Sequence, residues 1–410
     1  MACTPRHCYA SRTGAPLSRL EQLVPHPDYR DIVLTTPVSV PYERHSQRPA
    51  HWWLGRALRD LIVGAGLDKG AIDGLAAASF SLAPDPVVAL TRQFGLQTRW
   101  LESVPLGGAS GIVMLRRAAR AVEAGDATII ACIAGGTHRP GLLREVVRDF
   151  STASQDAVYP YASGGPNGNF ALITDHYMRR TGAQRSDFGK LCVAQRDNAL
   201  RFPHALMKTP LDLAAYLAAP SVAPPLGLYD CVMPCAGAEA FLVMHADTAR
   251  AAGLPAAHLV AAFERHNGFP DDPVQDRLGI AHDAEALWAA AGVAPADVDF
   301  VQTYDDYPVI SMLQFEALGL CGRGEAPEFV RHHDLRIGGS LPHNTSGGQL
   351  SVGQADAGGG SLGLVEAIRQ LTFSALGGQV RGARAGLVSG FGMIAYDRGL
   401  STAAAVLAST

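Results

Sequence analysis

The sequence predicts a layered α/β protein built around a mostly parallel sheet. Short apolar runs alternate with segments of helical period between residues 31 and 134, and the same alternation returns between residues 298 and 389. Two of the runs, residues 127–134 and 385–389, are apolar at almost every position, which is typical of strands that are covered on both faces. The chain has 410 residues, of which 48% are hydrophobic and 18% charged, so it can bury the core that such a fold needs.

The elements of the first group alternate between strand and helix. We expect strands at residues 31–40, 75–80, 97–103 and 127–134, and helices at residues 52–63, 86–94 and 110–123. Gly64 and Gly66 mark the end of the first helix, and Gly95 lies just past the second.

The end of the chain repeats this pattern. We expect strands at residues 298–303 and 385–389, and helices at residues 309–318 and 361–371. Residues 107–136 and residues 358–392 each run from a glycine-rich turn through a helix and a polar turn to a buried strand with a glycine-rich exit. Two such units, about 250 residues apart, indicate an internal duplication into two similar halves.

A less periodic segment, residues 137–230, separates the repeated units. We expect an inserted loop domain there, with helices at residues 175–180 and 185–200, because so long a segment in a compact protein usually serves function. The predicted division comprises a tail at residues 1–30, an N-terminal half at residues 31–268 that contains the loop domain, and a C-terminal half at residues 269–410, with residues 268–276 as the candidate link.

Composition and charge exclude several classes of function. With a net charge of -4 the chain lacks the excess of basic residues that nucleic-acid binding needs, and it has no basic run that would bind a membrane surface. The apolar stretches are strand-sized, far below the roughly 20 residues that cross a bilayer. Residues 1–30 lack an apolar core and predict a loose tail rather than a signal peptide. The 7 cysteines are scattered, and Cys231 and Cys235 lack a second pair at zinc-ribbon spacing, so we expect free thiols in a reducing cytoplasm and no metal.

Two glycine-rich turns precede helices, at residues 107–111 and 357–360. Such a turn lets backbone N–H groups approach a ligand oxygen at a helix N-terminus. Close packing of two helices explains the glycines equally well. Neither turn matches a dinucleotide or phosphate-loop fingerprint, so nucleotide redox chemistry is disfavoured.

Two further segments carry polar side chains suited to chemistry. A strand is expected to end, and a helix to begin, at Tyr304, Asp305, Asp306 and Tyr307. Open α/β sheets hold ligands at such strand ends, although either aspartate could simply cap the next helix. Residues 338–348, which include His343, form the densest polar and glycine-rich run, and a plain surface loop is the competing interpretation.

Four motifs, taken together, resemble the thiolase superfamily. They are GGASG at residues 107–111, YDDYP at 304–308, PHNTSGGQLSVGQ at 342–354 and LVSGFG at 387–392. The likeness is greatest to the sterol-carrier-protein thiolase-like branch and extends over most of residues 30–410. It implies a thiolase fold, with two βαβαβαββ halves in an αβαβα arrangement and an inserted loop domain. It also implies that the protein acts on acyl-CoA thioesters.

The catalytic positions depart from the thiolase pattern. Gly108 stands where thiolases carry the nucleophilic cysteine, and Gln354 stands at the histidine of their Gly-His-Pro motif. Ser389 takes the place of their second cysteine, and Tyr304 that of the asparagine or histidine in a third motif. Because glycine cannot accept an acyl group, ordinary thiolysis is excluded.

The pattern is similar to that of cysteine-less side-chain retro-aldolases within the same superfamily. These cleave a β-hydroxyacyl-CoA with one tyrosine at the strand end and another at the Gly-His-Pro position. The chain matches the first with Tyr304 and departs at the second, where Gln354 stands. The resemblance implies cleavage of a carbon–carbon bond without an acyl-enzyme, with coenzyme A as part of the substrate and no permanently bound cofactor.

Aldol cleavage needs a base for the hydroxyl group and hydrogen-bond donors for the enolate oxygen. We expect Tyr304 to be the base or acid. Four neighbours would tune its pKa or carry its proton: Asp305, Asp306, Tyr307 and His343.

The donors for the enolate oxygen are expected from the backbone. N–H groups near Gly108, Ser389 and Gly390 would provide them, and Gln354 can orient an oxygen but cannot titrate. Two other functions stay open. One is a Claisen-type acyltransferase that uses Cys132 or Ser389, although a small buried thiol is the simpler role for Cys132. The other is a non-catalytic subunit that keeps the thiolase shape to hold a partner.

The resemblance also implies partners. Thiolases dimerise, here through residues 98–101, and relatives of this branch often pair with a small OB-fold protein that bears a zinc ribbon. We therefore expect a homodimer, an acyl-CoA substrate and an OB-fold partner subunit. Steroid, aromatic and simple fatty acyl chains all remain open as substrates.

Overall fold

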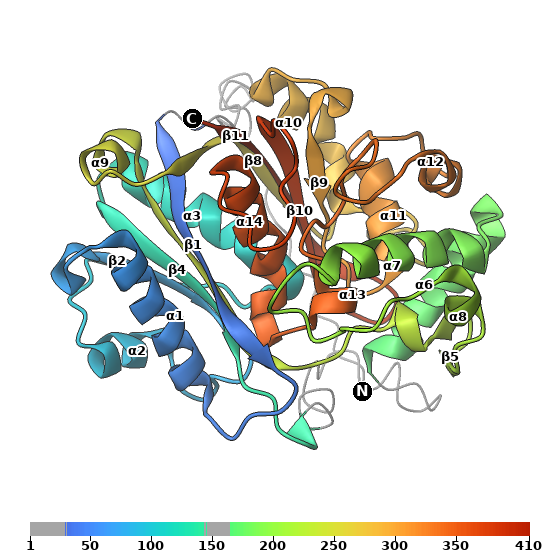
Figure 1. Ribbon diagram of the computed structural model, residues 1–410, viewed down its shortest axis with the longest axis horizontal. Coiled ribbons are helices and arrows are strands. Elements are labelled where there is room, and N and C mark those ends of the chain that lie inside the picture. Colours follow the sequence, from blue (N-terminus) through green and yellow to red (C-terminus); the bar gives the residue numbers. More distant parts are fainter. Residues whose placement is uncertain (1–28, 30, 143–144, 146–164) are drawn as a thin grey trace, which may run out of the picture.

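The structure, a computed structural model, describes residues 29, 31–142, 145 and 165–410 (Figure 1). The predicted N-terminal tail, apart from Tyr29, lies outside the described residues, and so does much of the first part of the predicted loop domain. In the described part of the chain, no helix is long and apolar enough to cross a membrane.

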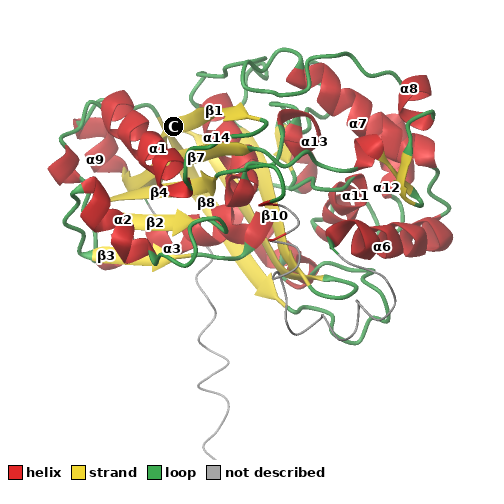
Figure 2. Cartoon of the chain, turned by 90° about the horizontal axis from the view of Figure 1, so that it is seen from below, coloured by secondary structure: helices red, strands yellow, loops and turns green. Residues whose placement is uncertain are grey.

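A nine-stranded mixed sheet runs through the molecule (Figures 1 and 2). The strands are β1 (Ile32–Glu43), β2 (Gly74–Ala78), β3 (Trp100–Ser103), β4 (Ile129–Gly136), β7 (Ala236–His245), β8 (Ala256–His266), β9 (Phe300–Gln302), β10 (Ala385–Ile394) and β11 (Gly399–Ser409). The prediction of a mostly parallel sheet is wrong. Among the strands that the structure describes, only β2 with β3, β2 with β4, and β9 with β10 pair in parallel, whereas β1, β7, β8 and β11 pair with their neighbours in antiparallel fashion. The reason at β10 and β11 is a short connection, which makes them a hairpin.

The order of the strands repeats from the centre outward. One group runs β1-β7-β4-β2-β3 and the other β8-β11-β10-β9. Strand β8 pairs with β11 along most of its length but with β1 only at Val33–Thr35. Its pairing therefore places β8 with the second group, ahead of the link predicted at residues 268–276.

The helices cover both faces of the two strand groups. They are α1 (Ala50–Ala65), α2 (Val87–Phe94), α3 (Ser110–Ala124), α6 (Pro166–Thr181), α7 (Arg185–Ala199), α8 (Leu213–Leu217), α9 (Ala246–Ala251), α10 (Ala284–Ala291), α11 (Pro308–Ala317), α12 (Ala326–His332), α13 (Gly348–Val352) and α14 (Gly359–Leu371). Helices α3 and α14 share one buried core with strands of both groups. Helix α1 packs on the outer face of the first group and α10 on that of the second (Figure 1). The predicted αβαβα layering is confirmed.

The two central helices approach each other through glycine. A β-carbon added to Gly111 would lie 2.2 Å from the carbonyl oxygen of Gly360. The interpretation of the glycine-rich turns as helix-packing elements therefore holds at these two positions. The same packing brings the N-terminal ends of α3 and α14 together, next to the ends of β9 and β10.

Candidate active site

Tyr304 fills the space beside Gly108. Gly108 lies in the 3-10 turn Gly107–Ala109 that leads into α3, and Tyr304 follows β9. A β-carbon added to Gly108 would lie 2.1 Å from Cε2 and 2.3 Å from Cζ of the tyrosine ring, well inside van der Waals contact. The phenol therefore takes up the room that a side chain at position 108 would need. With Tyr304 in this place, no cysteine can stand at residue 108.

The phenol oxygen of Tyr304 has a fixed partner. The side-chain amide of Gln354 donates a hydrogen bond of 3.0 Å from Nε2 to Oη of Tyr304. Gln354 is itself held by its backbone, which donates to Met233 and accepts from Cys235 at 2.9 Å each. Because Oη accepts the bond from Gln354, the phenolic proton stays available to a different acceptor.

The backbone of Tyr304 is braced by Gln314 and Ser389. Gln314 donates from Nε2 to the carbonyl oxygen of Tyr304 at 2.7 Å, and the N–H of Tyr304 donates to the carbonyl oxygen of Ser389 at 3.1 Å. The hydroxyl of Ser389 donates to Oε1 of Gln314 at 2.6 Å. The Ser389 hydroxyl is thus bound within this brace.

Strand β10 touches the turn at Gly108 through Gly390. A β-carbon added to Gly390 would lie 2.8 Å from the carbonyl oxygen of Gly108. The structure therefore brings together four of the predicted site residues, namely Gly108, Tyr304, Ser389 and Gly390, with Gln354 bound to the tyrosine.

Electrostatics keep the phenol of Tyr304 protonated. Burial raises the pKa of Tyr304 well above its usual range, the charge of Asp306 raises it further, and the hydrogen bond from Gln354 opposes the rise. Burial also raises the pKa of Asp306, with the neighbouring Asp305 adding to the effect. Oδ1 of Asp306 is buried and has no hydrogen-bond partner among the described residues. Asp306 is therefore a more basic carboxylate than an exposed one.

Asp305 has a structural partner. Its carboxylate accepts hydrogen bonds from the backbone N–H groups of Gln349 at 2.9 Å and of Leu350 at 3.3 Å, in the first turn of α13. The capping role considered from the sequence thus applies to Asp305, but at α13 rather than at the next helix along the chain. Burial raises its pKa to about 7.

Tyr307 and His343 lie next to the site but make their hydrogen bonds elsewhere. The ring of Tyr307 stacks on Phe170 at 4.0 Å, and its hydroxyl donates to Asn167 at 2.5 Å. His343 is fully buried with Nε2 at 2.8 Å from the hydroxyl of Thr303, and burial lowers its pKa to about 3. The imidazole is therefore neutral, and among the described residues His343 is hydrogen-bonded to Thr303, the chain neighbour of Tyr304, rather than to Tyr304 itself.

A narrow cavity of about 10 Å³ lies beside Tyr304, with room for about one water molecule. Its walls include three polar residues that sequence reasoning did not single out, namely Asn344, Ser346 and Gln349. Nδ2 of Asn344, Oγ of Ser346 and the amide of Gln349 are buried and have no hydrogen-bond partner of normal geometry among the described residues. Asn344 and Ser346 belong to the dense polar run at residues 338–348, which is the sequence signal for them, and Gln349 follows directly after it.

Cys132 lies outside this site. It is buried in the middle of β4, opposite Ala76 and Phe241 of the neighbouring strands, and burial raises the pKa of its thiol. The thiolate that a nucleophile needs is therefore disfavoured at Cys132.

Comparison with known proteins identifies the family. Residues 271–407 match the model of the thiolase C-terminal domain-like family. The 17-hydroxy-3-oxo-4-pregnene-20-carboxyl-CoA lyase of Mycobacterium tuberculosis is 30% identical over 350 residues, which are 80% of this chain and 88% of that protein. The chain belongs to the thiolase superfamily.

Other members of the superfamily resemble it over most of their length. The steroid side-chain-cleaving aldolase of Thermomonospora curvata is 29% identical over 332 residues, which are 75% of this thiolase-like chain and 82% of that aldolase. A solved structure of the Ltp2-ChsH2(DUF35) aldolase has a TM-score of 0.81 and 25% sequence identity, and it covers 92% of this chain and 98% of that one. The resemblance that the sequence motifs indicated is confirmed.

Proposed function

We propose that this thiolase-like protein cleaves a β-hydroxyacyl-CoA by a retro-aldol reaction that forms no acyl-enzyme. The observation that carries the proposal is that the ring of Tyr304 occupies the space that a side chain at residue 108 would need. The lyase and aldolase named among its relatives support the reaction class. Coenzyme A enters as part of the substrate, and the chemistry calls for no further cofactor.

The proton moves through Tyr304. The β-hydroxyl of the substrate gives its proton to Oη of Tyr304 as the phenolic proton passes on to the carboxylate of Asp306. The Cα–Cβ bond then breaks and a ketone or aldehyde leaves. The electron pair of the broken bond remains on the thioester as an enolate. Return of the proton through Tyr304 to Cα yields the shortened acyl-CoA. A phenol that is protonated at rest and a carboxylate of raised pKa suit this relay.

The enolate oxygen needs donors that are fixed in advance. We assign this role to the backbone N–H groups at Gly108 and Gly390, which the packing of β10 against the turn holds together. Nδ2 of Asn344 and Nε2 of Gln349 in the cavity wall, which have no hydrogen-bond partner of normal geometry among the described residues, offer further donors. Asp306 does not line the cavity, so we assign it a role through Tyr304 rather than on the substrate itself.

Partners and organisation belong to the same proposal. Strand β3 (Trp100–Ser103) lies at the edge of the sheet, which supports dimerisation by pairing of two such edges. The Ltp2-ChsH2(DUF35) aldolase supports a second subunit, for which we propose the OB-fold and zinc-ribbon type. Free thiols at the described cysteines support the cytoplasm as the compartment. We retain a loop domain at residues 137–230 and move the boundary between the halves ahead of β8.

Product analysis tests the reaction. The protein would be incubated with 17-hydroxy-3-oxo-4-pregnene-20-carboxyl-CoA and with a short β-hydroxyacyl-CoA, without free coenzyme A. We expect one carbonyl product and one shortened acyl-CoA in equal amounts from at least one of them, and no loss of activity after treatment with iodoacetamide. Cleavage of a 3-ketoacyl-CoA that depends on free coenzyme A would contradict the proposal.

A further inference from the structure

Tyr304 stands at the end of a short edge strand. Strand β9 (Phe300–Gln302) has 3 residues and pairs in the sheet only with β10. Its other side is held by a loop segment: the N–H of Val301 donates to Pro342 at 2.9 Å, and the N–H of Asn344 donates to Val301 at 3.0 Å. At 3 residues β9 lies at the short end of the range for strands, so few ladder hydrogen bonds hold the residues that follow it. The position of Tyr304 therefore depends on what anchors residues 342–345 as well as on its backbone hydrogen bonds to Gln314 and Ser389.

The anchor passes from Gln302 through Thr345. Gln302 and Thr345 exchange two hydrogen bonds, from Nε2 of Gln302 to the threonine hydroxyl at 2.8 Å and from the N–H of Thr345 to Oε1 of Gln302 at 3.2 Å. The hydroxyl of Thr345 then donates to Oε1 of Glu366 at 2.9 Å. A hydroxyl has a single proton, so this chain has only one direction and needs an acceptor at Glu366.

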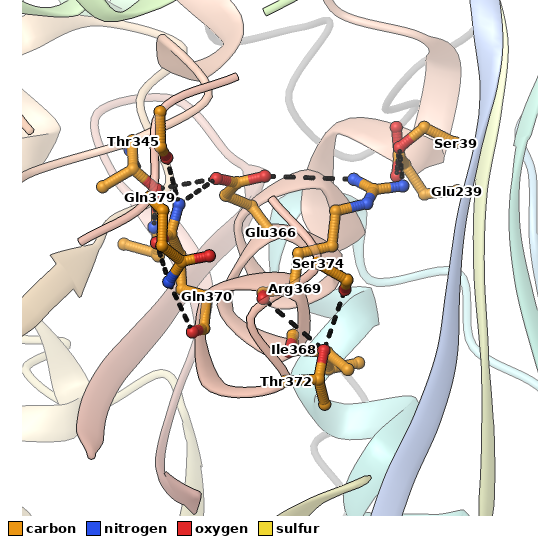
Figure 3. Close-up of polar contacts among 12 residues, drawn as sticks. Ser39, Glu239, Thr345, Glu366, Ile368, Arg369, Gln370, Thr372, Ser374 and Gln379 are labelled. Atoms are coloured by element: carbon orange, nitrogen blue, oxygen red, sulfur yellow. Dashed lines mark hydrogen bonds and ion pairs between the residues drawn. The ribbon is translucent and has the colours of Figure 1, made fainter. Parts of the chain in front are cut away.

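Glu366 ties the loop to the central helix α14 and to the first strand group (Figure 3). Its Oε1 also accepts from Gln370 at 2.8 Å, and its Oε2 faces Nη1 of Arg369 at 3.9 Å. Arg369 donates from Nη2 to the hydroxyl of Ser39 at 2.9 Å, and Ser39 donates to Glu239 at 2.6 Å. These charged side chains are buried, and such groups cost free energy unless they are paired.

We propose that Thr345 and Glu366 are positioning residues for Tyr304. They hold the loop at residues 342–345, and with it the end of β9, against α14. The predicted change in kcat rests on the proposed function. The geometric part, the placing of the Tyr304 ring, stands apart from any substrate.

An isosteric substitution isolates the hydroxyl. Thr345→Val keeps the volume and shape of the side chain but removes the donor to Glu366 and the acceptor for Gln302. We expect kcat to fall about tenfold to a hundredfold, because small misplacements of a catalytic group cost that much, with KM changed by less than about threefold. Thr345→Ser restores the hydroxyl and should return kcat to within about threefold of the parent value.

A matched control separates positioning from general loss of stability. Thr35→Val makes the same change at another buried threonine, in β1, whose hydroxyl donates to the carbonyl oxygen of Pro255 at 2.7 Å. We expect Thr35→Val to keep the parent kcat after correction for the folded fraction. The inference is overturned if Thr345→Val keeps the parent kcat, or if Thr35→Val loses as much.

A crystal structure of Thr345→Val tests the geometry without activity. We expect the bond of 3.0 Å from Gln354 to the oxygen of Tyr304 to be broken. An unchanged Tyr304–Gln354 pair would overturn the inference. If the parent enzyme cleaves no β-hydroxyacyl-CoA, the proposed function fails, whereas this structural readout still decides the role of Thr345.

Discussion

The ring of Tyr304 and the α-carbon of Gly108 are in such close contact that no β-carbon fits between them, since one would lie 2.1 Å from the tyrosine Cε2. In a thiolase, a nucleophilic side chain at position 108 would carry the acyl group. Here the same volume holds a phenol that is hydrogen-bonded to Gln354. Loss of the nucleophile and gain of the proton carrier are thus one packing change.

Gly108→Ala should disturb this contact directly. The added methyl group must push Tyr304 or the backbone of Phe391 aside, and overpacking of this kind costs about 1–3 kcal/mol of the free energy of unfolding. We expect a lower melting temperature and a loss of kcat that exceeds the loss of folded protein. Gly338→Ala is the control, because nothing lies within 4 Å of its added β-carbon. A Gly108→Ala variant as stable and active as the parent would count against the observed packing.

Gln354→Met keeps the size of the side chain but removes the donor to Tyr304. The hydrogen bond from Gln354 lowers the pKa of Tyr304, so its removal should raise that pKa. Since the working phenol is protonated, the alkaline limb of kcat/KM should move to higher pH, with kcat reduced about tenfold. Rate measurements across the alkaline range check the shift. A limb that stays in place, or moves to lower pH, would show that Tyr304 is not the group that titrates.

Ser389→Ala distinguishes the aldolase from an acyltransferase. The hydroxyl of Ser389 donates a hydrogen bond to Gln314, so it is not positioned to act as a nucleophile in this structure. We expect at least about a tenth of the parent kcat to remain, as for the loss of one hydrogen bond of about 1 kcal/mol. Intact-mass measurement of the parent protein during turnover should show no acyl adduct. An adduct that is absent in Ser389→Ala would establish the Claisen route instead.

Glu239 should make stability depend on pH. Burial raises its pKa to about 7 from an ordinary value of 4.5, with Arg369 opposing the rise. Between these values the folded protein holds a proton that the unfolded chain has released, so the free energy of unfolding falls as pH rises through this window. Glu239→Gln should remove up to roughly 3 kcal/mol of that fall. Denaturant titrations of both proteins near the two ends of the pH window give the free energy of unfolding at each pH. An equal change of that free energy with pH in the two proteins would contradict the prediction.

The sequence was sufficient for the layering and for most of the contacts at Tyr304. Apolar periodicity located β1, β2, β3, β4, β9 and β10 and the central helices, and the motif positions brought Gly108, Tyr304, Gln354 and Ser389 into one place. Strands β7, β8 and β11 are rich in alanine, a weak strand former, so apolar periodicity predicts neither these strands nor their antiparallel pairing.

The sequence left other features open because they depend on tertiary partners. Nothing in the run at residues 338–348 distinguishes His343, whose ring turns into the core toward Thr303, from Asn344 and Ser346, which line the cavity. Tyr307 is next but two to Tyr304 in the chain, yet its hydroxyl points to Asn167 of α6. Strand β9 is tied to Glu366 by two hydrogen bonds, one from Gln302 to Thr345 and one from Thr345 to Glu366. Gln302 and Glu366 are 64 residues apart in the chain, and no sequence motif connects them.

The turnover number of Tyr304→Phe tests the central claim most directly. This change removes only the phenolic oxygen, so the ring still fills the space beside Gly108. We expect kcat for retro-aldol cleavage to fall by about 10²- to 10⁴-fold, the usual contribution of a positioned proton-transfer group. Tyr177→Phe makes the same change at a buried tyrosine whose hydroxyl donates to Glu316 at 2.6 Å, and it should keep the parent kcat. A Tyr304→Phe enzyme that turns over within about threefold of the parent would contradict the account.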